Sequence, residues 1–202
     1  MNTLDKIFSS NNEIKTFAES YIDYLSRVLR NIALDDIERF VDVLLSARER
    51  GSTIYFIGNG GSAATASHFA NDIAVGTRTY EKPFRVISLC DNQAVITAIA
   101  NDDGYEKIFS QQLEILLKKD DVVVAISASG NSQNLLTAVD VAKRKEAITI
   151  GLTAFDGGKL RRAVDFSVHV PTEQKEYGPA EDAHMILDHL IGSYLIRFVK
   201  VH

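Results

Sequence analysis

A histidine and an aspartate stand four positions apart in a segment that we expect to be helical. His68 and Asp72 therefore project from one face of that predicted helix. An imidazole and a carboxylate at this spacing can chelate a divalent cation such as zinc. The same pair also occurs as a simple surface hydrogen bond, so spacing alone leaves a metal site and a surface contact open.

The last helical segment carries two further pairs of side chains that could bind a metal. Glu181 and His189 are eight positions apart, which corresponds to about 12 Å of axial rise on a straight helix. They can reach one ion only if Glu181 lies on an irregular first turn after Pro179, or if the two side chains come from different subunits. His184 and Asp188, four apart, form a competing pair that spacing does not exclude.

Two loops rich in glycine and hydroxyl groups follow directly after short apolar runs. The first reads Gly58-Asn59-Gly60-Gly61-Ser62, and the second reads Ser127-Ala128-Ser129-Gly130-Asn131-Ser132. Glycines let backbone N–H groups approach an anion, and helix N-termini bind phosphate oxygens. The sequence has neither the dinucleotide fingerprint nor a Walker lysine, so a single phosphate fits better than a nucleotide. Either loop taken alone could be an ordinary turn with a serine or asparagine cap.

Five short runs of β-branched and apolar residues predict the strands that position these loops. The runs span residues 53–57, 84–89, 122–126, 148–152 and 166–170, and they alternate with helical stretches near 62–75, 92–100, 106–118, 132–145, 157–163 and 179–200. Runs this short suit parallel strands that are buried on both faces. The sequence therefore predicts an α/β fold, a doubly wound and mainly five-stranded parallel sheet flanked by helices, of the flavodoxin or Rossmann type.

Two helices are expected before the first strand. One spans residues 14–30, and the second begins with Asp35 as its N-cap and ends near Gly51. Because they precede every strand, they cannot be crossover connections, and we expect them to pack beside the sheet or on a neighbouring subunit. We expect one domain over residues 1–202, with leading helices over about 14–50 and an α/β core over about 52–202.

Composition excludes several classes of function. The chain of 202 residues carries a net charge of −5 and no run of basic residues, which argues against direct binding to nucleic acid. Cys90 is the only cysteine, so an intrachain disulfide and a four-cysteine zinc site are both excluded. We find neither a signal-peptide pattern nor an apolar run of membrane-spanning length, and we expect a cytoplasmic protein with no membrane partner.

The order of these motifs resembles the sugar isomerase (SIS) family. Residues 58–64 and 68–70 resemble its first signature, while Asn101-Asp102 and residues 127–132 resemble the next two. The last helix continues the match with Glu181, His184 and His189. The similarity runs from residue 14 to the C-terminus and is greatest to the phosphoheptose isomerase branch. This resemblance implies an SIS-like fold, a phosphorylated sugar substrate, a zinc ion, and a homo-oligomer, a tetramer in that branch, with active sites at subunit interfaces.

The resemblance also implies roles for individual residues. The expected substrate contacts are Asn59, Gly60, Gly61, Ser62, Asn101, Asp102 and Glu181, and the expected phosphate contacts are Ser127, Ser129 and Ser132. The metal ligands and the acid–base pair fall at His68, Asp72, Glu181 and His189. We expect Asp72 to carry the proton between C1 and C2 of the sugar, and His189 to act as general acid–base, with a core histidine as the alternative for His189.

Three positions depart from the usual pattern of the heptose enzymes. Asp72 stands in place of Glu, Glu181 in place of Gln, and Ala128 in place of Thr. The expected reaction is the aldose–ketose isomerisation of sedoheptulose 7-phosphate. One alternative is the isomerisation of another sugar phosphate, such as arabinose 5-phosphate. Another is a non-catalytic SIS protein that acts through protein contacts, such as a replication-initiation cofactor, although such a scaffold has no need of His68, a carboxylate at position 72 and His189.

Overall fold

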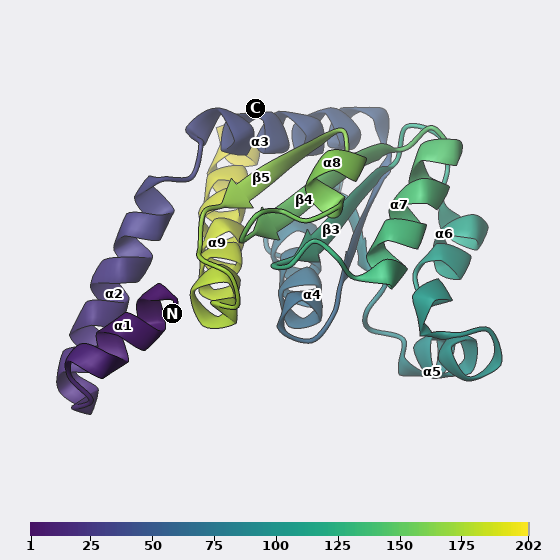
Figure 1. Cartoon of the computed structure of the whole chain (residues 1–202). Helices are drawn as coiled ribbons and strands as arrows, with labels where there is room; N and C mark the ends of the chain where they lie inside the picture. The colour runs from purple at the N-terminus through teal and green to yellow at the C-terminus, as the bar shows by residue number, and fades with distance from the viewer. Residues whose placement is uncertain (202) are drawn as a thin grey trace.

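The computed structural model describes residues 1–201 and shows a parallel sheet between two layers of helices (Figure 1). The strands are β1 (Thr53–Gly58), β2 (Arg85–Ser88), β3 (Val122–Ser127), β4 (Ile148–Ala154) and β5 (Phe166–Val170). The helices are α1 (Thr3–Ser10), α2 (Ile14–Arg30), α3 (Leu34–Arg50), α4 (Gly61–Ala74), α5 (Gln93–Asp102), the 3₁₀ turn η1 (Tyr105–Lys107), α6 (Ser110–Leu116), α7 (Gln133–Arg144), α8 (Leu160–Ala163) and α9 (Tyr177–Val201). All five predicted strands are present.

The sheet has the order β2-β1-β3-β4-β5, and every neighbouring pair is parallel. The winding reverses between β1 and β3, which pair directly with each other. In doubly wound folds a ligand binds beyond the carboxyl ends of the strands at such a reversal. The predicted fold class is confirmed, and both glycine- and hydroxyl-rich loops lie at this reversal because they follow β1 and β3.

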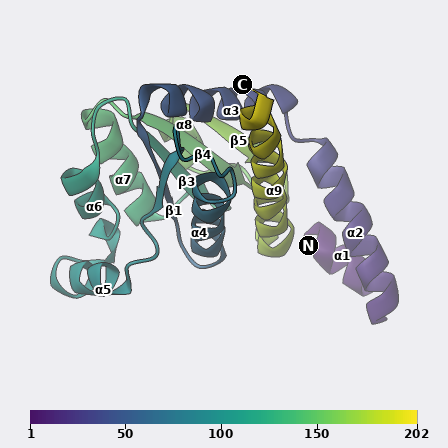
Figure 2. The ribbon, with the colours of Figure 1, turned by 180° about the vertical axis from the view of Figure 1, so that it is seen from behind.

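Alternate residues of each central strand enter two separate cores. In β1, Ile54 and Phe56 belong to the core beneath α3, α4 and α9, whereas Tyr55 and Ile57 belong to the core beneath α6 and α7. Figure 2 shows α4 and α9 side by side in front of the sheet, with α3 across one end. This two-sided burial explains the continuous apolar runs of the central strands. The edge strand β2 differs from the prediction, because Arg85 and Ile87 are exposed there.

The N-terminal helices lie beside the core. Helix α2 has the predicted bounds, and α1 is an additional helix that the sequence pattern did not predict. The predicted cap of α3 was wrong by two positions: Ala33 is the N-cap, and Asp35 lies in the first turn. A carboxylate in that turn stabilises the helix through the helix dipole, without acting as the cap. Helix α2 packs against α9, and the Tyr21 hydroxyl of α2 donates a hydrogen bond of 2.5 Å to Asp182 of α9.

Two predicted helices are shorter than expected. The stretch 106–118 is divided into η1 and α6, and the stretch 157–163 becomes helical only at Leu160. Gly157 and Gly158 have φ values of +79° and +55°, so their backbone cannot form the start of a right-handed helix. Within residues 1–201, none of the helices combines the length and the apolar character that crossing a membrane requires.

Candidate functional site

The loops after β1 and β3 meet in a hollow of about 160 Å³ at the carboxyl edge of the sheet. Its lining consists mainly of hydroxyl, amide and carboxylate side chains: Asn59, Ser62, Ile126, Ser127, Ala128, Ser129, Ser132, Tyr177 and Glu181. Helices α4 and α7 begin beside this hollow, and their free N–H groups favour an anion there. The structure thus brings together five of the residues predicted from the two loops, namely Asn59, Ser62, Ser127, Ser129 and Ser132.

The first loop can turn this tightly because it contains glycine. A Cβ atom on Gly58 would lie 2.5 Å from the backbone oxygen of Ser62, which leaves no space for a side chain. Gly60 takes a left-handed conformation, with φ of +54°. Ser62 is buried in the first turn of α4 and faces the hollow.

In the second loop, one serine hydroxyl is held by a hydrogen bond within the loop and another is free of such bonds. The Ser127 hydroxyl accepts a hydrogen bond of 3.0 Å from the backbone N–H of Gly130, and this bond closes the turn. Ser132 is the N-cap residue of α7, and its side chain makes no capping hydrogen bond within the described chain. Its hydroxyl therefore remains available to a ligand in the hollow.

Helices α4 and α9 run in parallel and place further side chains beyond the hollow. Gly61 lies against Glu181, since a Cβ atom on Gly61 would be 2.2 Å from Glu181 Oε2. His68 Nε2 lies 3.9 Å from Asp188 Oδ2, and Asp72 lies next to Gly192. The two partners of each contact are 120 positions apart in the sequence, so one register accounts for all three contacts.

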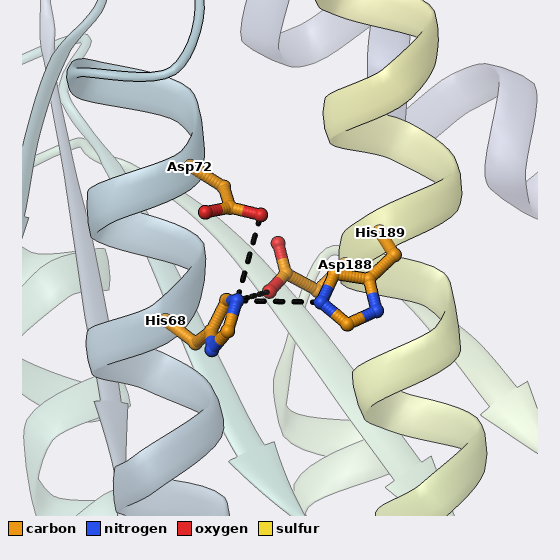
Figure 3. A group of neighbouring side chains, drawn as sticks. All are labelled: His68, Asp72, Asp188 and His189. Carbon is orange, nitrogen blue, oxygen red and sulfur yellow. Dashed lines mark hydrogen bonds and ion pairs between the residues drawn. The ribbon is translucent and has the colours of Figure 1, made fainter.

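Four ligand-type side chains meet between the two helices, as Figure 3 shows. His68 and Asp72 come from α4, while Asp188 and His189 come from α9. One ligand atom from each residue lies within 4.8 Å of all the others. His68 Nε2 is central, at 3.6 Å from Asp72 Oδ2 and 3.3 Å from His189 Nε2. The predicted trio His68, Asp72 and His189 is therefore assembled within one chain.

This group fits a divalent cation chemically. Two imidazoles and two carboxylates form a ligand set that suits zinc. Asp188 is fully buried, and neither of its oxygens has a hydrogen-bond partner among residues 1–201. Burial, together with the charge of Asp72, raises the pKa of Asp188 to about 7. A buried carboxyl group without hydrogen-bond partners is costly, and a bound cation would reduce that cost.

Comparison with known proteins identifies the family of the chain. The family model described as the SIS domain matches residues 16–154, which is more than half of the chain. The chain belongs to the SIS family. The match ends before β5 and α9, so the residues that the last helix contributes lie outside it.

Two relatives of this SIS chain are both named phosphoheptose isomerase. It is 34% identical over 183 residues to the phosphoheptose isomerase of Aneurinibacillus thermoaerophilus, covering 90% of this chain and 91% of that protein. It is also 34% identical over 181 residues to the phosphoheptose isomerase of Geobacter metallireducens, covering 90% and 94%. The solved structure of phosphoheptose isomerase GmhA from Neisseria gonorrhoeae superposes with a TM-score of 0.81 at 27% identity, covering 91% of this chain and 98% of that one.

Other predicted residues of the SIS chain lie apart from the four-residue group. Glu181 lines the hollow instead, and burial raises the pKa of its carboxyl group. Because α9 is continuous from Tyr177, the irregular first turn that would have let Glu181 reach the ion is absent from the described helix. Asn101 and Asp102 are exposed at the end of α5 and bond to each other, outside the lining of the hollow. His184 and Asp188, the competing pair, do not share a site. Asp188 belongs to the four-residue group, whereas His184 is fully buried and is not part of that group.

Three polar residues at the SIS site were not predicted from the sequence. Asn134 exchanges two amide hydrogen bonds, of 2.9 and 2.8 Å, with Asn59. The Tyr105 hydroxyl donates a third bond, of 2.9 Å, to the same Asn59 oxygen. Tyr177 lines the hollow and packs edge-on against Phe155. No local motif marks these residues, because each one reaches the site through contacts between distant segments.

Proposed function

We propose that this chain is a phosphoheptose isomerase, which converts sedoheptulose 7-phosphate to D-glycero-D-manno-heptose 7-phosphate through an enediol. The product would enter heptose biosynthesis for lipopolysaccharide or capsule. The observation that carries the proposal is the position of Asp72 and His189 on two helices whose first turns border the hydroxyl-lined hollow. The names of the relatives at 34% identity support the same substrate.

The phosphate would bind in the hollow. Ser62, Ser129 and Ser132 present hydroxyl groups there, and the N-termini of α4 and α7 add partial positive charge. Ser127 would act mainly by holding the turn, since its hydroxyl already accepts a bond from Gly130. Asn59, Gly60, Gly61, Asn101, Asp102 and Glu181 remain proposed substrate contacts.

The reacting end of the sugar would lie between α4 and α9. His68 follows Ser62 by six residues, which is about 9 Å of axial rise along α4. A separation of this size favours a long sugar chain, whose phosphate and carbonyl group are several carbons apart. Binding the distant phosphate would hold C1 and C2 beside the proton-transfer groups.

Proton transfer would use one carboxylate and one imidazole. Asp72 would take the proton from one carbon and return it to the other, while His189 would exchange protons with the ring or hydroxyl oxygens. A zinc ion held by His68, Asp72, His189 and a second carboxylate would supply polarisation of the carbonyl oxygen. Asp72 is one methylene shorter than Glu, so its carboxylate reaches less far from α4.

We further propose a cytoplasmic homo-oligomer, a tetramer with active sites at its interfaces. A groove of about 320 Å³ between α3 and α9 is lined by Leu34, Ile37, Glu38, Val41, Asp42, Leu190 and Tyr194. Leu34, Leu190 and Tyr194 are exposed in the single chain, and Leu190 follows the proposed catalytic His189 directly. A second copy covering this groove would bury these apolar side chains next to the site. Light scattering of the purified protein tests the assembly.

The direct experiment compares substrates. The zinc-loaded protein is incubated with sedoheptulose 7-phosphate and with arabinose 5-phosphate, and aldose–ketose interconversion is followed by NMR. We expect turnover of the heptulose and at least a hundred-fold lower kcat/KM for the pentose. A preference for the pentose would establish the alternative isomerase, and binding of both sugars with no turnover of either would establish the non-catalytic alternative.

A further inference from the structure

Asp188 lies in a position where the protein leaves its carboxyl group unsatisfied. Its side chain has no exposed surface, and both oxygens lack a hydrogen-bond partner within residues 1–201. An ionised carboxylate needs donors or a cation, and a protonated one still needs an acceptor for its O–H. Neither form therefore finds a hydrogen-bond partner among the residues that the structure describes. Oxygen Oδ2 points towards the other members of the four-residue group and lies 3.9 Å from His68 Nε2 (Figure 3).

We infer that Asp188, and not Glu181, supplies the second carboxylate ligand of the metal site. The inference rests on the metal-assisted function proposed above. With His68, Asp72 and His189 it gives four ligand atoms within 4.8 Å of one another, all from one chain. A tetrahedral zinc ion with bonds of about 2.0–2.2 Å has ligand atoms separated by distances within this range.

Position along α9 argues against Glu181. It precedes Asp188 by seven residues, which is about 10 Å of axial rise on this continuous helix. The parallel register places Glu181 against Gly61 in the first turn of α4, whereas His68 and Asp72 occupy later turns. Glu181 therefore lines the hollow, where its carboxylate can accept hydrogen bonds from sugar hydroxyl groups.

The two carboxylates can be tested with a matched pair of variants. Asp188→Asn and Glu181→Gln each remove one negative charge from the same helix with almost no change in shape. Zinc affinity is measured on the metal-free proteins by competition with a chromogenic chelator. We expect Asp188→Asn to weaken zinc binding by about ten-fold or more, and Glu181→Gln to change it by less than about two-fold. Unchanged affinity in Asp188→Asn, or a ten-fold loss in Glu181→Gln, would overturn the inference.

A second measurement covers the case in which Asp188→Asn folds poorly. Zinc-anomalous diffraction from crystals of the unaltered protein locates the ion and its ligands directly. The inference requires an Asp188 oxygen at about 2.0–2.2 Å from zinc. A zinc ion bound by Glu181 with Asp188 outside its ligand shell would contradict it.

Thermal melting separates ligation from a purely structural role. Metal-free Asp188→Asn should melt at the same temperature as the metal-free wild type or higher, because the substitution replaces a buried carboxyl group that has no hydrogen-bond partner among residues 1–201. The rise in Tm on adding zinc should be smaller than in the wild type. A lower metal-free Tm with an unchanged zinc-induced rise would show a structural role instead. Neither zinc measurement depends on turnover, so a chain that binds zinc through Asp188 and isomerises no sugar would refute only the proposed function.

Discussion

The Nε2 atoms of His68 and His189 lie 3.3 Å apart, although 121 positions separate the two residues in the sequence. Two adjacent imidazoles repel each other when both are positively charged. When both are neutral, their unprotonated nitrogen atoms can bind a cation between them. The parallel packing of α4 and α9 imposes this proximity on the side chains. Two helices from distant parts of the chain thus bring together a pair of histidines that a bound cation would stabilise.

Asp72→Asn should abolish most of the turnover while leaving sugar-phosphate binding intact. The amide keeps the shape of the side chain but cannot accept the C1/C2 proton, and the loss of a general base costs about 10²–10⁴-fold in rate. Rate assays at saturating zinc, which keep the altered site loaded, give kcat, and isothermal titration calorimetry under the same conditions gives the affinity for the sugar phosphate. Asp140→Asn, an exposed aspartate on α7, is the control and should match the wild type. A kcat within three-fold of wild type in Asp72→Asn would remove the residue from the proton-transfer step.

Ser129→Ala should weaken binding of the phosphate end of the substrate. A hydrogen bond to a charged group contributes about 1.5–3 kcal/mol, so the dissociation constant for the sugar phosphate should rise by roughly ten- to a hundred-fold. Titration calorimetry with sedoheptulose 7-phosphate measures this change. Ser9→Ala, an exposed serine on α1, serves as the control. If Ser129→Ala bound the sugar phosphate as tightly as the wild type, the phosphate would have to lie elsewhere.

Gly58→Ala should be destabilising, whereas Gly61→Ala should cost little stability. The methyl group added at position 58 would lie 2.5 Å from the backbone oxygen of Ser62, which cannot move without distorting the loop, and overpacking of this kind costs about 1–3 kcal/mol. The methyl group added at position 61 would lie 2.2 Å from Glu181 Oε2, the end of a flexible side chain that can rotate away. Urea denaturation of the two variants measures the difference in the free energy of unfolding. Equal losses in both variants would show that the rigid backbone contact at Gly58 is not decisive.

The buried imidazole of His184 should make the fold sensitive to acid. Burial lowers its pKa from 6.5 to about 4 in the folded chain. Between these two values the unfolded chain binds a proton that the folded chain does not, so stability falls as the pH decreases from about 6.5 to about 4. The loss should approach 3 kcal/mol, by roughly 1.4 kcal/mol for each pKa unit. Denaturation of the wild type and of His184→Gln at several pH values measures the difference, and parallel pH profiles for the two proteins would refute it.

The strands and their two functional loops could be predicted from the sequence because the signals are local. Residues 122–126 are apolar throughout, and the loop that follows contains three serines around one glycine. Burial on both faces of a parallel strand imposes such a run whatever the neighbouring elements are. The edge strand β2 shows the limit of this rule, since Ile87 is apolar and yet exposed.

The ligand role of Asp188 could not be predicted in the same way. Its spacing from His184 indicated a pair on one helix, but the structure directs His184 into the core and Asp188 towards His68. That difference depends on the register between α4 and α9, which no local pattern encodes. Asn134 was missed for the same reason, because its bonds to Asn59 join segments 75 positions apart.

The central claim is that the site between α4 and α9 isomerises a heptose phosphate with a metal ion present. The most direct test follows sedoheptulose 7-phosphate labelled with ¹³C at C2 by NMR, with zinc-loaded protein and with protein stripped by a chelator. We predict that the ketose carbon signal is replaced by an aldose signal with the loaded protein, at a rate at least ten-fold above that of the stripped protein. An unchanged ketose signal with fully zinc-loaded, folded protein would contradict the claim.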